Sequence, residues 1–282
     1  MLDIFKAIFL GIIEGITEWL PISSTGHLIL ANELIKLNVS EAFMEMFEVV
    51  IQLGAIMAVV VLFWNKLWPF TTRQISGVTP IVKNIGIKKS SFSLWVKVII
   101  ASLPAAIIGL PLDDKINELF FNPTTVAVAL IVYGVAFILI EHFKKNTEPK
   151  VATLKQFTYK TALFVGLFQA LSMIPGTSRS GSTILGAMLL GCSRTVAAEF
   201  SFYLAVPVMF GASALKLVKF GLNFTGTEFM ILAAGMIISF AVSIIVIKFL
   251  LGFIRKNSFK AFGYYRIALG IIVLLYFYVL AK

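Results

Sequence analysis

The stretch EGITEWLPISSTGH, residues 14–27, places two carboxylates, a run of hydroxyl side chains and a histidine in one short segment. It lies in a chain of 282 residues, of which 59% are hydrophobic and only 13% are charged. Because soluble proteins carry about 25% charged residues, this composition indicates a membrane protein. Ionisable groups inside a membrane are energetically costly and usually mark a functional site. The stretch therefore predicts a polar site within the membrane.

Apolar segments of helical length recur along the whole chain. They cover residues 2–20, 23–36, 43–64, 93–111, 122–142, 157–174, 181–191, 195–217, 227–250 and 262–280. Helices are expected, because backbone groups in lipid must find hydrogen-bond partners within their own segment. A transmembrane β-barrel would need alternating segments of roughly ten residues, which the sequence lacks. We therefore predict an all-α polytopic membrane protein with one integral membrane domain, 1–282.

Two pairs of these segments differ from the others, because only a short polar turn separates their members. PISS separates 2–20 from 23–36, and PGTSRS separates 157–174 from 181–191. Segment 181–191 is too short to cross about 30 Å of hydrocarbon at roughly 1.5 Å per residue. We expect each pair to form a re-entrant helical hairpin whose polar tip lies inside the membrane. Six helices then remain to span it.

The distribution of charge predicts how these spans are oriented. The connections 65–92, 143–158 and 251–261 are basic, whereas 33–45 and 112–121 are acidic. The net charge of +10 therefore fits a basic cytoplasmic face, and nucleic acid is not an expected partner. Six spans and two re-entrant hairpins then place both termini outside, and the first hairpin enters the membrane from outside.

The two halves of the chain resemble each other around the polar turns. GIIEGITEWLPISSTGHLIL, residues 11–30, and GLFQALSMIPGTSRSGSTIL, residues 166–185, share the same order of features. Each has a glycine, an acid or amide, a proline, a hydroxyl run, a second glycine and an apolar helix. Three spans separate the hairpins, so the repeats, approximately 1–143 and 157–282, must be inverted. Because such repeats place their site near the membrane midplane, we expect the two polar tips to meet there.

The first tip carries a pair of carboxylates. Glu14 and Glu18 are four residues apart, so they share one face of a helix. Such a pair can hold a divalent metal ion or position a water molecule. Two protonated or locally hydrogen-bonded carboxyl groups are the alternative.

Hydroxyl groups and a histidine follow the proline of this tip. Ser23, Ser24 and Thr25 lie at the start of the next predicted helix. Free backbone N–H groups and the positive end of the helix dipole favour an anion at this place. His27 follows within the first turn, where it can act as an acid, a base or a nucleophile near neutral pH.

The second tip, PGTSRSGST at residues 175–183, combines hydroxyl groups with a cation. Ser178, Ser180 and Thr183 supply hydroxyls, and the guanidinium of Arg179 suits phosphate oxygens. A buried arginine needs a partner. That partner is either a glutamate of the first tip or a phosphate held between them, bridged by Mg²⁺ or Ca²⁺.

Other polar side chains fit supporting roles. Glu48, Gln52 and Glu199 lie early in their spans at matching places of the two repeats, and we expect them to brace the hairpins. Cys192 is the only cysteine, so no internal disulfide can form. We expect it to behave as a small apolar residue in a packed segment.

The motifs of the two tips resemble those of a known family. EGITE, residues 14–18, resembles the (E/Q)xxxE motif of the undecaprenyl-diphosphate phosphatase family of the bacitracin-resistance type. PGTSRSGST, residues 175–183, resembles its PGxSRSxxT motif at every fixed position, and the histidine after SSTG is present as His27. The resemblance extends over essentially the whole chain.

The resemblance implies an integral plasma-membrane hydrolase that depends on a divalent cation. Such an enzyme removes the terminal phosphate of undecaprenyl diphosphate, giving undecaprenyl phosphate and inorganic phosphate. The product is the lipid carrier for cell-wall polymers, and the reaction removes the target of bacitracin. The family's site is thought to face the outer side, in agreement with the predicted topology.

A division of roles between the two tips follows from this interpretation. Arg179 and the hydroxyls of the second tip hold the diphosphate and stabilise the charge that develops. Glu14 and Glu18 bind Mg²⁺ or Ca²⁺, or orient the attacking group. The sequence leaves three versions of the attack open: Ser24 with His27 as base, His27 itself, or a water that His27 activates.

Two other classes of function share some of these features. A polyprenyl-phosphate flippase or transporter would use the same anion site and the same broken helices, but it would need no nucleophile. An intramembrane serine protease would pair a serine of SRSGS with His27 and would leave Arg179 and the carboxylate pair unexplained. The expected partners are a polyprenyl diphosphate lipid and the bilayer, and a homodimer is one of the open alternatives.

Overall fold

The computed structural model describes residues 2–74, 83–221 and 223–280. It is built of helices with one short antiparallel sheet. In chain order the elements are α1 (Leu2–Thr17), α2 (Ser24–Leu34), α3 (Glu41–Leu62), α4 (Trp64–Leu67), β1 (Phe70–Gln74), β2 (Lys83–Ile87), α5 (Lys89–Phe120), α6 (Pro123–Phe143), α7 (Tyr159–Ala170), η1 (Leu171–Met173), α8 (Arg179–Leu189), α9 (Arg194–Phe220), α10 (Gly226–Lys256), α11 (Lys260–Leu275) and η2 (Tyr276–Leu280).

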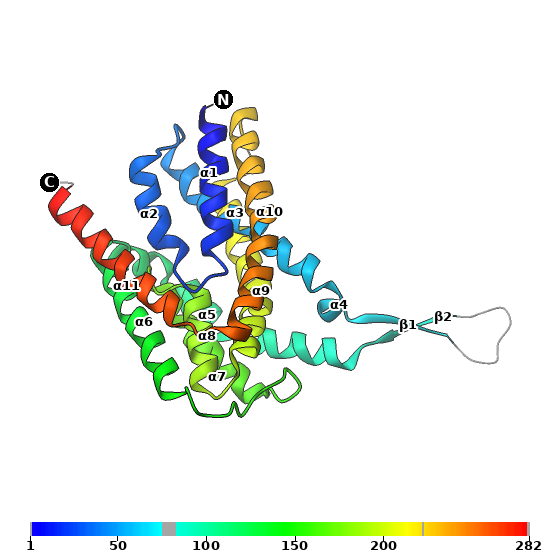
Figure 1. The fold of residues 1–282 in the computed structure, drawn as a ribbon. Coiled ribbons are helices and arrows are strands. Elements are labelled where there is room, and N and C mark those ends of the chain that lie inside the picture. The colour runs from blue at the N-terminus through cyan, green and yellow to red at the C-terminus, as the bar shows by residue number, and fades with distance from the viewer. Residues whose placement is uncertain (1, 75–82, 222, 281–282) are drawn as a thin grey trace.

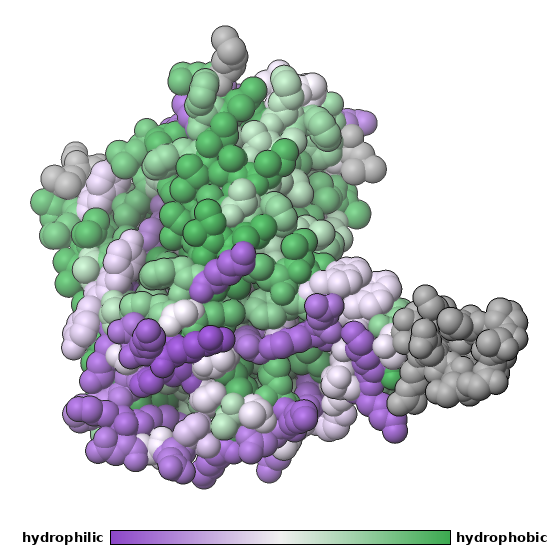
Figure 2. Space-filling model, turned by 45° about the vertical axis from the view of Figure 1, so that its right-hand side comes forward, coloured by the Kyte–Doolittle hydropathy of each residue, from purple (hydrophilic) through white to green (hydrophobic). Residues whose placement is uncertain are grey.

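Six helices of the described chain are long and apolar enough to cross a membrane, as the sequence predicts. They are Glu41–Leu62, Lys89–Gly109, Pro123–Phe143, Arg194–Phe220, Gly226–Lys256 and Lys260–Val279. Figure 2 shows apolar side chains over the upper part of the molecule and hydrophilic ones gathered at its lower end. Both ends of the chain lie toward the opposite, upper end (Figure 1).

The helices pack through a small number of extensive contacts. α10 packs against both α1 and α3, and α3 also packs against α9. α5 packs against α7 and α9, and α11 packs along α6. Glycines allow some of these helices to pack closely. A Cβ atom added to Gly11 of α1 would lie only 2.6 Å from the carbonyl oxygen of Gly235 in α10.

The two short helix pairs keep their polar tips inside the helical body. The tip between α1 and α2 is called the first turn below, and the tip between α7 and α8, with Arg179 and Ser180 at the start of α8, is called the second turn. α1 packs against α2, and α7 packs against α8. Ser23 precedes α2 with φ 74° and Ser178 precedes α8 with φ 69°, the only non-glycine positive φ values among the described residues. Each serine hydroxyl caps its helix, accepting from the N–H of Gly26 at 3.3 Å or Gly181 at 3.2 Å. The same local geometry therefore occurs at both polar turns.

The connection expected at 112–121 is largely helical. α5 continues to Phe120 and contains Pro104 and Pro111. A proline removes one backbone hydrogen bond and kinks a helix, but neighbouring helices can support the chain on either side. The end of the apolar run therefore does not mark the end of this helix.

The basic connection 65–92 contains more structure than the sequence indicates. β1 and β2 form an antiparallel pair in which Phe70 lies opposite Ile87 and Gln74 opposite Lys83. Figure 1 shows the two strands projecting away from the helices. A two-stranded ribbon with mixed polar and apolar residues gives little periodic signal, so the sequence does not distinguish it from a loop.

Candidate active site

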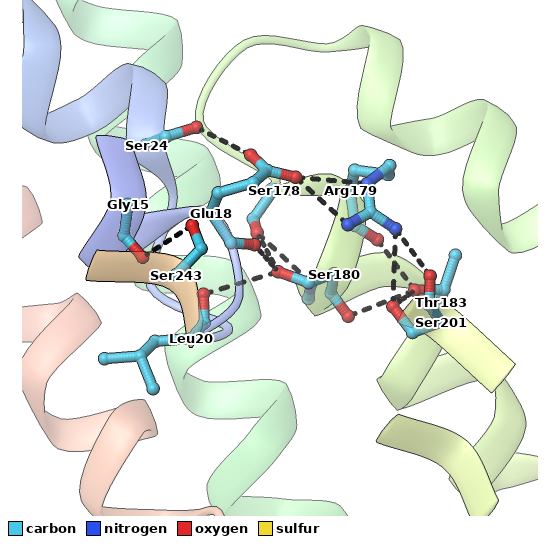
Figure 3. A network of polar contacts seen from close by, with 11 residues as sticks. Gly15, Glu18, Leu20, Ser24, Ser178, Arg179, Ser180, Thr183, Ser201 and Ser243 are labelled. Carbon is cyan, nitrogen blue, oxygen red and sulfur yellow. Dashed lines mark hydrogen bonds and ion pairs between the residues drawn. The ribbon is translucent and has the colours of Figure 1, made fainter. Parts of the chain in front are cut away.

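An ion pair between the two polar turns forms the centre of the candidate site. Nη2 and Nε of Arg179 lie 3.0 Å and 3.2 Å from Oε1 of Glu18 (Figure 3). The two side chains are 10% and 6% exposed. A buried pair is stable only with good geometry and further hydrogen bonds. Nη1 of Arg179 supplies one of these, because it donates to the backbone oxygen of Ser201 at 2.8 Å.

Ser180 joins the two turns through backbone atoms. Its hydroxyl is within 3.0 Å of the backbone oxygen of Glu18 and 3.3 Å of that of Leu20, and it donates to these carbonyls. The Ser178 hydroxyl lies 3.1 Å from that of Ser180 and caps α8. These two hydroxyls, expected to bind substrate, therefore help to hold the turns together.

Thr183 has a similar local role one turn into α8. Its hydroxyl donates to the backbone oxygen of Arg179 at 2.9 Å and lies 2.6 Å from the hydroxyl of Ser201. Thr183 and Ser201 are fully buried. They position the first turn of α8, which carries Arg179, against α9.

Ser24 links this ion pair to a cavity. Its hydroxyl donates to Oε2 of Glu18 at 3.3 Å, so the two carboxylate oxygens face different partners (Figure 3). Ser23 is buried at the turn, whereas Ser24 and Thr25 line the cavity. The Glu18 carboxylate thus lies between the guanidinium of Arg179 and a hydroxyl on the cavity wall.

The cavity beside Ser24 has a volume of about 370 Å³. α2, α3, the start of α6 and η2 enclose it. Its lining is polar at Ser24, Thr25, Asn32, Glu48, Gln52 and Asn122 and apolar at Leu28, Ile29, Val49, Phe121, Pro123 and Phe277. Such a mixed wall suits a ligand that has both a polar and an apolar part.

His27 has different neighbours from those that the sequence suggests. Its Nδ1 is 2.7 Å from the backbone oxygen of Ser23, and its Nε2 is 2.7 Å from the hydroxyl of Tyr265. The imidazole and the Tyr265 ring are stacked, with centroids 5.5 Å apart. Because a carbonyl can only accept, Nδ1 carries the proton and Nε2 accepts from Tyr265 in the neutral ring. Its polar contacts are thus with Ser23 and Tyr265, and not with Glu18 or Arg179.

Glu14 is fully buried one helical turn before Glu18. Neither of its carboxylate oxygens has a hydrogen-bond partner among the described residues. Glu18, Glu48 and Arg179 are the charged groups whose fields act on it. A buried carboxylate without donors requires a proton or a cation. Glu14 is therefore the acidic group of the site that would carry a proton beside Glu18 or bind a cation.

Arg266, which is not among the site residues predicted from the sequence, holds both turns in place. This fully buried side chain on α11 donates from Nη2 to the backbone oxygens of Gly176 at 2.8 Å and Thr177 at 3.0 Å. Its Nη1 donates to the backbone oxygen of Pro21 at 3.2 Å. Arg266 is the only charged residue in segment 262–280, which is the signal that could have revealed it.

Replacing Arg266 by methionine is expected to destabilise the fold by roughly 3 kcal/mol or more. Backbone carbonyls of both turns would lose their donors, and each buried unpaired group costs roughly 1–3 kcal/mol. Thermal unfolding in detergent measures the effect, with Arg255→Met as the control because Arg255 is exposed at the end of α10. Equal unfolding temperatures for the two variants would exclude the bracing role.

Two of the supporting residues behave differently from each other. Glu48 accepts a hydrogen bond from Asn32 of α2, which fits the expected bracing of the first turn. Glu199 instead forms an ion pair with Lys66 at 2.8 Å and accepts from the Tyr203 hydroxyl at 3.2 Å. The expectation that Glu199 braces the second hairpin is therefore wrong, because its polar partners are Lys66 of α4 and Tyr203 of its own helix.

The fold and the candidate site together define a polytopic helical membrane protein with a buried ion pair between two polar turns. A sequence model of the family described as "Bacitracin resistance protein BacA" matches residues 7–272. The chain belongs to this family. The match confirms the resemblance indicated by the motifs of the two turns.

Relatives in several bacteria are similar over nearly their full length. A protein of Acetivibrio thermocellus named undecaprenyl-diphosphatase is 64% identical over 277 residues, or 98% of each chain. Undecaprenyl-diphosphatase 1 of Clostridioides difficile is 58% identical over 280 residues, which cover 99% of this chain and 98% of its own. An undecaprenyl-diphosphatase of Enterococcus faecalis is 58% identical over 274 residues, or 97% of each chain.

Proposed function

We propose that this chain is an undecaprenyl-diphosphatase. It hydrolyses the terminal phosphate of undecaprenyl diphosphate, which supplies the lipid carrier for cell-wall synthesis and confers bacitracin resistance. The observation that carries the proposal is the Arg179 guanidinium held at the start of α8, joined through Glu18 to a hydroxyl on the wall of the cavity. Relatives named undecaprenyl-diphosphatase, which match over nearly their whole length, support it.

Phosphate binding changes the partners of Glu18. A guanidinium binds phosphate oxygens through two parallel hydrogen bonds, so an incoming diphosphate competes with Glu18 for Arg179. A carboxylate released from a cation becomes a stronger base. Substrate binding thus frees the carboxylate that accepts the hydrogen bond of Ser24.

Ser24 is the attacking group that this geometry favours. As its oxygen bonds to the terminal phosphorus, its proton passes to Glu18, and the bridging P–O bond breaks to release undecaprenyl phosphate. Water then hydrolyses the phosphoserine and gives inorganic phosphate. His27 holds the backbone of Ser23 next to the attacking Ser24, because its two ring nitrogens contact the Ser23 carbonyl and the Tyr265 hydroxyl.

A divalent cation fits the carboxylates of the first turn. Glu14 offers two buried oxygens without partners, and oxygen ligands are those that Mg²⁺ and Ca²⁺ prefer. Among the described residues, no group of three or more histidine, cysteine, aspartate or glutamate side chains could hold a metal ion, so Glu14 would hold the cation together with phosphate oxygens of the substrate, while Glu18 serves as the base. When bound, the cation neutralises charge on the phosphate oxygens.

Rapid quenching with a substrate labelled in its terminal phosphate tests the attacking group. We expect the label on Ser24, and we expect Ser24→Ala to prevent labelling while Thr25→Ala, its neighbour on the cavity wall, retains it. A label on His27, or turnover without any labelled protein, would rule out attack by Ser24. Either result would leave the hydrolase function itself standing.

An inverted repeat with two re-entrant hairpins accounts for the arrangement of the helices. The packing of α1 on α10 corresponds to that of α7 on α5, because each contact joins the first helix of one half to the matching later helix of the other half. Ser23 and Ser178 supply the matching turn geometry. Both observations support two related halves, approximately 1–143 and 157–282.

The same topology orients the chain in the plasma membrane. The basic connections face the cytoplasm, both termini lie outside, and the cavity at Ser24 opens to the outer face. In a Cys192→Ser background, a membrane-impermeant maleimide added to the outside should label Thr227→Cys and spare Asn146→Cys, both exposed positions. The reverse pattern would invert the orientation.

A further inference from the structure

A second cavity, larger than the one at Ser24, lies at the basic end of the molecule. Its volume is about 600 Å³. It forms where the end of α6 and the connection after it meet the α8–α9 turn and the end of α10. Figure 1 places the α6–α7 connection at the lower end of the molecule, where Figure 2 shows hydrophilic side chains. None of its lining residues belongs to the two polar turns.

The lining of this basic cavity is strongly cationic. It contains Lys144, Lys145, Lys150, Arg194 and Arg255, five cations against two carboxylates. One carboxylate, Glu141, is already neutralised, because it is buried and accepts from Nε of Arg194 at 2.7 Å. The other, Glu148, is exposed.

The remaining titratable group of the lining adds no negative charge. Burial raises the pKa of the Cys192 thiol to about 11, so this group is neutral at physiological pH. The cavity therefore keeps an excess of positive charge that no group within it neutralises.

Backbone contacts fix the position of these cations. The N–H of Val151 donates to the Gly191 oxygen at 3.1 Å, and the N–H of Ser193 donates to the Val151 oxygen at 2.9 Å. The side chain of Lys150 packs directly against Gly191. A Cβ atom added to Gly191 would lie only 3.2 Å from the Cβ atom of Lys150. Lys144 donates to the backbone oxygen of Met188 at the end of α8. The α6–α7 connection is thus held against the α8–α9 turn, and its lysines line the cavity.

Exposed apolar side chains adjoin the cations. Leu189, which lines the cavity, is 52% exposed, and Phe143, next to Lys144, is 74% exposed. In a chain that spans a membrane, such residues face the acyl chains while the cations lie at the headgroup level. Basic pockets between helices at the cytoplasmic surface suit anionic headgroups.

We infer that this basic cavity binds the phosphate group of an anionic ligand, either an anionic phospholipid headgroup or free phosphate. Lys144, Lys150 and Arg255 reach it from two separate parts of the chain and supply the charge. The exposed Leu189 and Phe143 provide a surface for acyl chains, which only a lipid would use. The cavity is separate from the Glu18–Arg179 site, so its occupancy does not depend on the proposed hydrolysis.

Binding of defined probes to the purified full-length protein in neutral detergent tests this inference. The probes are phosphatidylglycerol, phosphatidylcholine and inorganic phosphate, each titrated and followed by native mass spectrometry and thermal unfolding. The test variant is Lys150→Gln/Arg255→Gln. The control is Lys89→Gln/Lys160→Gln, which removes two exposed cations that do not line this cavity.

We expect phosphatidylglycerol to bind wild type about tenfold more tightly than phosphatidylcholine, since each nearby cation strengthens an anionic headgroup contact. The test variant should lose this preference and the control should keep it. If inorganic phosphate alone shows the same dependence on Lys150 and Arg255, the site binds a soluble phosphate. If both variants lose the preference for phosphatidylglycerol equally, or if both keep it, the inference is overturned.

Discussion

Arg179→Ala is expected to lower the rate of phosphate release by about a thousandfold. Removing a donor that stabilises transferring phosphate costs roughly 10²–10⁵ in rate, depending on the enzyme. This variant removes every hydrogen bond from the second turn to the Glu18 carboxylate. Release of inorganic phosphate from undecaprenyl diphosphate by purified protein measures the effect.

A pair of lysine variants separates the catalytic role of Arg179 from its structural one. Arg179→Lys keeps the charge but loses the planar fork, and we expect it to be slower by about a hundredfold. Arg194→Lys makes the same change in another ion pair, that with the buried Glu141, which lies outside the site. It should change the rate less than tenfold. Similar losses in both would mean that Arg179 acts only through the stability of the fold.

Glu14→Gln is expected to lower activity by about a hundredfold without lowering the unfolding temperature. Losing roughly 3 kcal/mol of charge stabilisation by a bound cation corresponds to this factor. The fold should not suffer, because the Glu14 oxygens have no hydrogen-bond partner to lose. Titration of phosphate release with Mg²⁺ should show a requirement at least tenfold higher than in wild type.

Glu45→Gln serves as the control for this change. Glu45 is an exposed carboxylate on α3 that pairs with Lys216 at 3.4 Å, away from the two turns. Its variant should keep the Mg²⁺ dependence of wild type. If Glu14→Gln also keeps that dependence, the first turn does not hold the cation, and Glu14 is a protonated buried side chain instead.

Hydropathy predicts the six spanning helices well, because length and apolar composition are properties of each segment alone. It does not predict where α5 ends, since the chain beyond Pro111 stays helical despite its polar residues. The β1–β2 ribbon was also missed. Its short strands carry no clear alternation that would distinguish them from a basic loop.

The sequence predicts most residues of the candidate site, but it does not predict their contacts. The order of motifs identifies Glu18 and Arg179, yet it cannot choose between Glu14 and Glu18 as the partner, because both share one helical face. Hydroxyls such as Ser180 turn toward backbone carbonyls only after the turns dock. Tyr265 lacks any local signal, since its contact with His27 exists only in the folded chain.

The central claim is that the polar turns of the two halves form one hydrolytic site. Phosphate release from undecaprenyl diphosphate, measured with equal amounts of folded wild type, Glu18→Gln and Arg179→Ala, tests it most directly. We predict Mg²⁺-dependent release by wild type, abolished by EDTA and lost in both variants, one from each turn. No release by wild type, or full release by either variant, would contradict the account.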